Sequence, residues 1–135
     1  MTLPAWSEAF AEGRLGPAPS LDLEAPFTSE WAYGDGSGRG VRVAVIDSGV
    51  DAVHPAVGEV HGYIAFEHDP TAERELRRTD TPHEDLYGHG TACAGIIRAL
   101  APEVELYSVR VLGPRLTGKA FVFASALEWC IDNAM

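Results

Sequence analysis

The sequence predicts an α/β fold in which a mainly parallel sheet is covered by helices, and three observations point to it. Residues 41–46, VRVAVI, are almost entirely apolar and rich in valine, which is typical of a parallel strand buried on both faces. A run of small and aliphatic residues between 87 and 100 predicts a helix that packs closely against a sheet. Residues 105–111, ELYSVRV, favour a further strand, and an apolar helix that is buried in the fold is expected over residues 119–134.

An aspartate, Asp47, directly follows the first predicted strand, and Ser48 and Gly49 come next. In open α/β folds the carboxyl ends of the strands form the edge at which ligands bind. A lone aspartate at a strand end is nevertheless common in nucleotide-binding and phosphotransfer folds. Asp47 is therefore a candidate site residue, but its position after a strand does not show which reaction it would serve.

A histidine between two glycines, His89, precedes the predicted helix of small residues. Imidazole has an ordinary pKa near neutrality, so it can take a proton and return it within one catalytic cycle. An isolated Gly-His-Gly tripeptide is also compatible with a structural histidine at the start of a buried helix. The strand-end aspartate earlier in the chain favours the catalytic interpretation of His89.

Composition narrows the partners that this chain is expected to have. A hydrophobic content of 46% fits a globular domain, and a net charge of −10 argues against binding to nucleic acid or to anionic membranes. No stretch approaches the roughly 20 apolar residues of a membrane span. The first ten residues lack the basic start and apolar core of a secretory signal, so a cytoplasmic product is expected unless the start is misassigned.

The sequence predicts no metal and no cofactor. Cys93 and Cys130 lack metal-ligand spacing, and both are expected to be reduced and buried. Residues 59–85 carry several histidines and carboxylates, but a site built from Glu67, His68 and Asp69 fits no helix face. A solvated surface loop is the expected structure of residues 59–85.

Residues 1–40 are predicted to form an irregular N-terminal arm, with one domain over residues 41–135. Prolines and glycines interrupt every regular pattern in the arm, which is expected to lie on the surface and to be anchored by Trp6, Phe27 and Trp31. The glycine-rich residues 34–40 precede a strand, whereas a dinucleotide-binding loop follows one.

Four blocks of the chain together resemble the subtilisin-like serine proteases, in the order in which that family carries them. They are VAVIDSGVDAVHP, DLYGHGTACAG, VELYSVRVLG and GKAFVFASALEWCIDNAM, within residues 31–135. The resemblance implies a doubly wound, mainly parallel sheet with helices on both faces, present here as its N-terminal portion. It also implies a serine endopeptidase with an Asp-His-Ser triad, in which Asp47 and His89 are two members.

The resemblance further implies where a peptide or protein substrate binds. Leu116, Thr117 and Gly118 correspond to an edge to which the substrate adds as an extra strand, although the residues alone favour a plain Gly-Pro turn between strand and helix. The short connector over residues 98–103 leaves no room for a calcium-binding loop that many relatives insert there. Some relatives with a cysteine near the position of Cys93 are sensitive to mercurials.

The nucleophilic serine that the family uses is not expected within this chain. It follows the histidine by roughly 150 residues, which places it near residue 240, while the chain has 135 residues. Ser48 is expected to make a turn hydrogen bond and not to attack a substrate. The chain alone is therefore predicted to be inactive and to need a C-terminal half, without which the strands over 41–46 and 105–111 are expected to lack neighbours.

Two other functions remain open at this point. A non-catalytic protease homologue that binds peptides would share every feature described above. An α/β hydrolase or phosphotransfer domain with Asp47 as its nucleophile would need a nearby cation site.

Overall fold

The computed structural model describes residues 36–69, 71 and 75–135, together with residues 28, 30, 32 and 34. Asp35–Met135 form one compact unit. The proposed anchors of the N-terminal arm, Trp6, Phe27 and Trp31, lie outside the described residues, so the arm stays a prediction. None of the helices within the described residues has the length and apolar character needed to cross a membrane.

Four strands and two helices make up the described part of the domain. In chain order they are β1 (Arg42–Asp47), β2 (Gly62–His68), β3 (Leu76–Thr79), α2 (His89–Leu100), β4 (Glu105–Arg110) and α3 (Ala120–Asp132). The strands form one sheet in the order β1-β4-β2-β3, in which β4 pairs in parallel with both β1 and β2. Only β3 runs antiparallel, beside β2, so the prediction of a mainly parallel sheet is confirmed.

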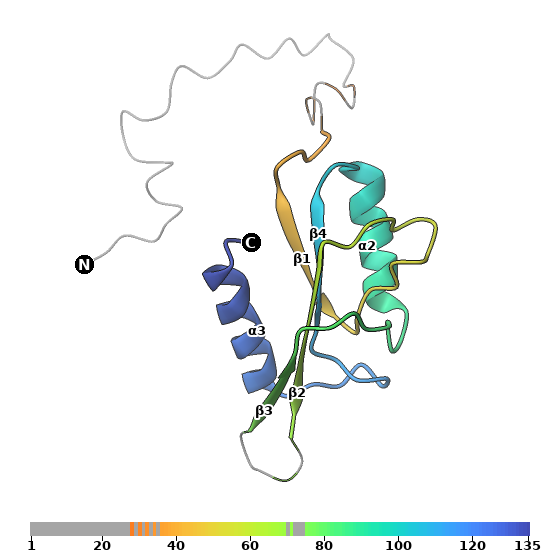
Figure 1. The fold of residues 1–135 in the computed structure, drawn as a ribbon. Coiled ribbons are helices and arrows are strands. Elements are labelled where there is room, and N and C mark those ends of the chain that lie inside the picture. The colour runs from red at the N-terminus through yellow and green to blue at the C-terminus, as the bar shows by residue number, and fades with distance from the viewer. Residues whose placement is uncertain are drawn as a thin grey trace, which may run out of the picture. The chain divides into compact units, whose positions relative to one another are not determined.

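The two helices cover opposite faces of this sheet, as the α/β prediction requires (Figure 1). Successive side chains of a strand point to opposite faces, and β1 shows this clearly. Val45 packs in one apolar cluster with Ala94 of α2, whereas Ile46 packs in the other with Val122 of α3. The sheet is thus the middle of three layers, with one apolar core on each side of it.

The expectation of a solvated loop over residues 59–85 is wrong, because this region supplies β2 and β3. Ile64, Ala65 and Phe66 of β2 are buried in the domain. This short apolar run is flanked by charged residues and histidines, so the sequence does not clearly indicate a strand there. A run of this length is enough for a central strand but too short for a clear periodicity.

The expectation that residues 105–111 lack neighbouring strands is also wrong, because β4 lies between β1 and β2. The unrecognised strand β2 occupies the position that was expected to be open. For residues 41–46 the expectation holds in part. Within the described residues β1 pairs with one strand, β4, and no strand lies along its other edge.

The helix α3 is not buried on most faces, which corrects a further expectation. Its buried residues are Val122, Ala126 and Cys130, which lie four residues apart and so share one stripe. Leu127 and Ile131, in contrast, are 53% and 75% exposed. Of the two cysteines, Cys130 is buried as expected, and this burial raises the pKa of its thiol.

Candidate active site

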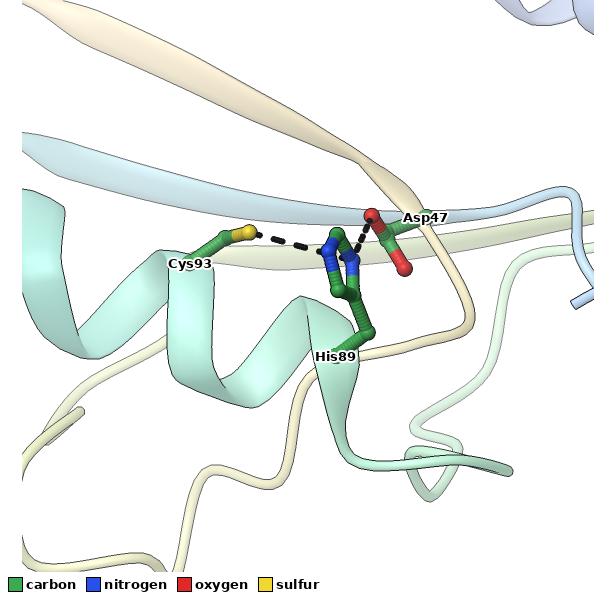
Figure 2. A group of neighbouring side chains, drawn as sticks. All are labelled: Asp47, His89 and Cys93. Atoms are coloured by element: carbon green, nitrogen blue, oxygen red, sulfur yellow. Dashed lines mark hydrogen bonds and ion pairs between the residues drawn. The ribbon is translucent and has the colours of Figure 1, made fainter.

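Asp47 and His89 meet at the carboxyl end of β1. Asp47 is two residues beyond Val45, and the alternation along the strand therefore directs both side chains to the face that α2 covers. His89 is the first residue of α2. Its Nδ1 atom lies 2.7 Å from Oδ2 of Asp47, within hydrogen-bonding distance, and Figure 2 shows the two side chains facing each other.

The two members of this pair differ in their access to solvent. The side chain of Asp47 is 13% exposed, whereas that of His89 is 55% exposed. Since Nδ1 faces the carboxylate, Nε2 is the ring nitrogen left for another group, and no hydrogen bond to Nε2 occurs among the described residues. A largely buried aspartate that orients an accessible imidazole is an arrangement suited to a general base.

Two glycines allow α2 to approach β1 closely enough for this contact. Gly88, which precedes the helix, has a φ of 103°, a conformation that other residues adopt only with strain. A Cβ atom on Gly90 would collide with the carbonyl oxygen of Gly49 and would lie 3.1 Å from Cβ of Asp47. The small residues around His89 therefore allow α2 to pack closely against the end of β1.

A second carboxylate, that of Asp85, lies just before α2. Its Oδ2 accepts hydrogen bonds from the backbone N–H of Thr91 at 2.8 Å and from the Thr91 hydroxyl at 2.6 Å. Its Oδ1 accepts from the backbone N–H groups of Tyr87 and Gly88. Partial burial alone would raise the pKa of Asp85, but the hydrogen bonds outweigh it and hold the pKa well below its ordinary value.

Ser48 connects this second carboxylate to the first. Its side chain is fully buried, and Oγ lies 2.7 Å from Oδ1 of Asp85 and 3.1 Å from Oδ1 of Asp47. Its backbone N–H also donates to Asp47 Oδ1 at 2.7 Å. Ser48 thus makes local hydrogen bonds to Asp47, as a turn residue is expected to, but its shorter side-chain bond reaches Asp85, 37 residues further along the chain.

Asp85 is a site residue that the sequence reasoning did not identify. The available signal was an acidic residue close before the start of a helix, where it can accept hydrogen bonds from the first free N–H groups. This signal was masked because Asp85 lies within the region that was expected to be a solvated loop.

Cys93 lies one helical turn beyond His89, and the expectation that it is buried is wrong, since it is partly exposed. Its Sγ atom is 3.8 Å from Nδ1 of His89 (Figure 2). Asp47, His89 and Cys93 each offer one possible metal-ligating atom, and these three atoms lie within 4.8 Å of one another. The direct contact between His89 and Asp47 accounts for the placement of these two side chains without a metal.

The predicted substrate edge lies in the loop between β4 and α3. Leu116 is partly buried there, and Thr117 and Gly118 are exposed. Thr117 and Gly118 border a cavity of about 600 Å³. The start of this loop lies beside Asp47. The backbone N–H groups of Val111 and Leu112 donate hydrogen bonds to the carbonyl oxygen of Asp47.

Comparison with known proteins relates the chain to one family. The sequence profile described as the subtilase family matches residues 38–135. Subtilisin E of Bacillus subtilis (strain 168) is 34% identical over 122 residues, which cover 84% of this chain and 29% of that protein. Subtilisin Savinase of Lederbergia lenta is 35% identical over 108 residues, which cover 73% of this chain and 36% of that protein.

A solved structure shows that the fold, too, is shared. The crystal structure of a cold adapted subtilisin-like serine proteinase superposes with a TM-score of 0.52 at 24% identity, over 81% of this chain and 38% of that one. The chain thus spans about a third of the length of the relatives it matches. The chain belongs to the subtilase family, and residues 38–135 correspond to an N-terminal portion of the family's catalytic domain.

Proposed function

We propose that this chain is part of a serine-type endopeptidase, to which it contributes the aspartate and the histidine of an Asp-His-Ser triad. The observation that carries the proposal is the 2.7 Å contact between His89 Nδ1 and Asp47 Oδ2, with the imidazole accessible beyond it. Membership of the subtilase family supports the same reaction.

In this mechanism each residue has a separate role. Asp47 accepts the Nδ1–H of His89, which selects the tautomer whose Nε2 lone pair is free, and it stabilises the imidazolium that forms later. His89 takes the proton of the serine hydroxyl through Nε2 as the serine attacks the scissile carbonyl. It then returns this proton to the leaving amine.

The substrate is proposed to be a peptide or protein segment in extended conformation. Leu116, Thr117 and Gly118 would pair with its backbone as a neighbouring strand does. The exposure of Thr117 and Gly118 and the adjoining cavity of about 600 Å³ support this assignment.

A hydrolase that uses Asp47 as its own nucleophile is not favoured. Both carboxylate oxygens already accept hydrogen bonds, Oδ2 from His89 and Oδ1 from Ser48. An oxygen held in this way is a poorer nucleophile than a free one, and its two partners restrict the approach of a substrate.

The proposed function can be tested in a chimera in which residues 38–135 replace the matching part of subtilisin E, whose remainder brings the serine. The chimera is expected to hydrolyse a peptide substrate, and His89→Ala should lower kcat/KM at least about a hundredfold because the general base is lost. His61→Ala, at an exposed histidine just before the amino end of β2, whereas this pair lies at the carboxyl end of the parallel strand β1, is the matched control and should retain the rate.

Equal rates for His89→Ala and the parent chimera would contradict the proposal. The 135-residue chain by itself serves as the blank. It is expected neither to cleave casein nor to react with a fluorophosphonate probe, since the family's nucleophile would come from a C-terminal portion. Covalent labelling of any serine of this chain would contradict that part of the account.

A further inference from the structure

The carboxylate of Asp85 is shared between the two elements that carry Asp47 and His89. It accepts five hydrogen bonds, which come from the Ser48 hydroxyl, the backbone N–H groups of Tyr87, Gly88 and Thr91, and the Thr91 hydroxyl. A carboxylate can accept this many only when it is ionised, because a protonated oxygen becomes a donor. Its negative charge is also favourable beside the N-terminus of α2.

One side of this network ends at the carboxylate of Asp47. The single hydrogen of the Ser48 hydroxyl lies between two acceptors, and Asp85 Oδ1, at 2.7 Å, is closer than Asp47 Oδ1, at 3.1 Å. The oxygen of Ser48 in turn lies 3.5 Å from the backbone N–H of Gly90, which directs that group toward it. Asp85 therefore sets the rotamer of Ser48, and Ser48 contacts both Asp47 and the residue after His89.

The other side of the network holds the backbone on both sides of His89. Asp85 binds the N–H of Gly88, one residue before the histidine, at 2.8 Å. It binds the N–H of Thr91, two residues after the histidine, also at 2.8 Å. The position of this backbone sets the direction of the Cα–Cβ bond of His89. Since the side chain of His89 is 55% exposed, few other contacts hold it in place.

We propose that Asp85 is a positioning residue, which holds His89 Nδ1 against Asp47 Oδ2 by tying the first turn of α2 to the end of β1 through Ser48. This inference rests on the proposed function, in which that contact selects the tautomer of the general base. Asp85 touches no reacting atom and acts only through its neighbours.

The tautomer of His89 reports this role directly and needs no nucleophile. It is read from the ¹⁵N shifts of the two ring nitrogens in the ¹⁵N-labelled 135-residue chain, at a pH where imidazole is neutral. The parent chain should hold His89 mainly as the Nδ1–H form. Asp85→Asn replaces one acceptor oxygen by an NH₂ donor, and should shift the tautomer ratio about fivefold or more toward Nε2–H, the equivalent of one lost hydrogen bond.

Two further variants separate positioning from general stability. Ser48→Ala removes only the link between the two carboxylates and should shift the ratio in the same direction, with no additive effect when combined with Asp85→Asn. Asp80→Asn makes the same chemical change at an exposed aspartate that pairs with Arg78, and should leave the ratio unchanged. Backbone amide spectra show which variants keep the native fold.

A folded Asp85→Asn or Ser48→Ala chain with the parent tautomer ratio would overturn the inference. So would loss of the native amide spectrum in both variants, because Asp85 would then be structural and not positioning. Asp47→Asn distinguishes this failure from failure of the proposed function. If Asp47→Asn leaves the ratio unchanged, the Asp47–His89 pair itself is refuted, whereas a shift in Asp47→Asn without one in Asp85→Asn refutes the positioning role alone.

Discussion

Around His89, the size of each neighbouring residue decides whether the imidazole reaches its partner. Gly90 has no Cβ, and for this reason the first turn of α2 can lie against the turn that follows Asp47. Gly88 adopts the left-handed conformation that directs the chain into the helix. The 2.7 Å contact between His89 and Asp47 is thus a consequence of backbone geometry as much as of charge.

Cys93 is predicted to affect His89 without taking part in the reaction. Its Sγ lies 3.8 Å from Nδ1 of His89, so a mercurial bound to the thiol would displace the imidazole from its line toward the serine. In the active chimera, Cys93→Ala should retain peptidase activity and become insensitive to p-chloromercuribenzoate. The measurement is the residual rate of peptide hydrolysis with and without the mercurial.

His89→Ala is the reference for this experiment, because it removes the general base itself. If Cys93→Ala were as inactive as His89→Ala, the thiol would be the nucleophile and the serine mechanism would have to be abandoned.

At the scale of elements, the segment between β3 and α2 is held to the sheet by His83. Its Nε2 lies 2.9 Å from the hydroxyl oxygen of Ser108 in β4, and its ring packs edge-on against Tyr63 of β2 at a centroid distance of 5.3 Å. Burial, together with the nearby positive charge of Arg110, lowers the pKa of His83 below its ordinary value of 6.5.

This lowered pKa predicts that the fold loses stability on mild acidification. Below pH 6.5 the unfolded chain binds a proton at residue 83 that the folded chain resists, so the free energy of unfolding falls as pH falls through that value. Above 6.5 the contribution is fully present. His83→Gln keeps a polar side chain without this titration, and should flatten the dependence of the thermal midpoint on pH between about 8 and 5. Parallel curves for the two proteins would contradict the prediction.

The elements that the sequence predicts well are those with a long or distinctive pattern. VRVAVI predicts β1 because five of its six residues are apolar, and the small residues after His89 predict α2. The strand β2 was missed because its apolar run is short and flanked by charged residues and histidines, and β3 was missed because Leu76 is its one apolar residue. Asp85 was missed with them, since its role depends on partners from β1 and α2 that only the fold brings together.

At the scale of the whole molecule, residues 38–135 correspond to one portion of the family's catalytic domain. The chain spans 29% of the length of subtilisin E, and β1 has one neighbouring strand among those described. Even so, the described residues place Asp47 and His89 in contact and support both with a partly buried hydrogen-bond network. The acid and base of the proposed triad are thus assembled by local packing around β1 and α2, before any nucleophile is added.

The most direct test of this account is the rate at which a fluorophosphonate labels the nucleophilic serine of the chimera, since labelling depends on activation of that serine and not on peptide binding. Asp47→Asn should lower the second-order rate constant by about 10²- to 10⁴-fold, because the imidazole loses the partner that selects its tautomer. Asp80→Asn, an exposed aspartate, should react at the parent rate. If Asp47→Asn were labelled as fast as Asp80→Asn, Asp47 would not be the partner of a catalytic histidine, and the proposed triad would be wrong.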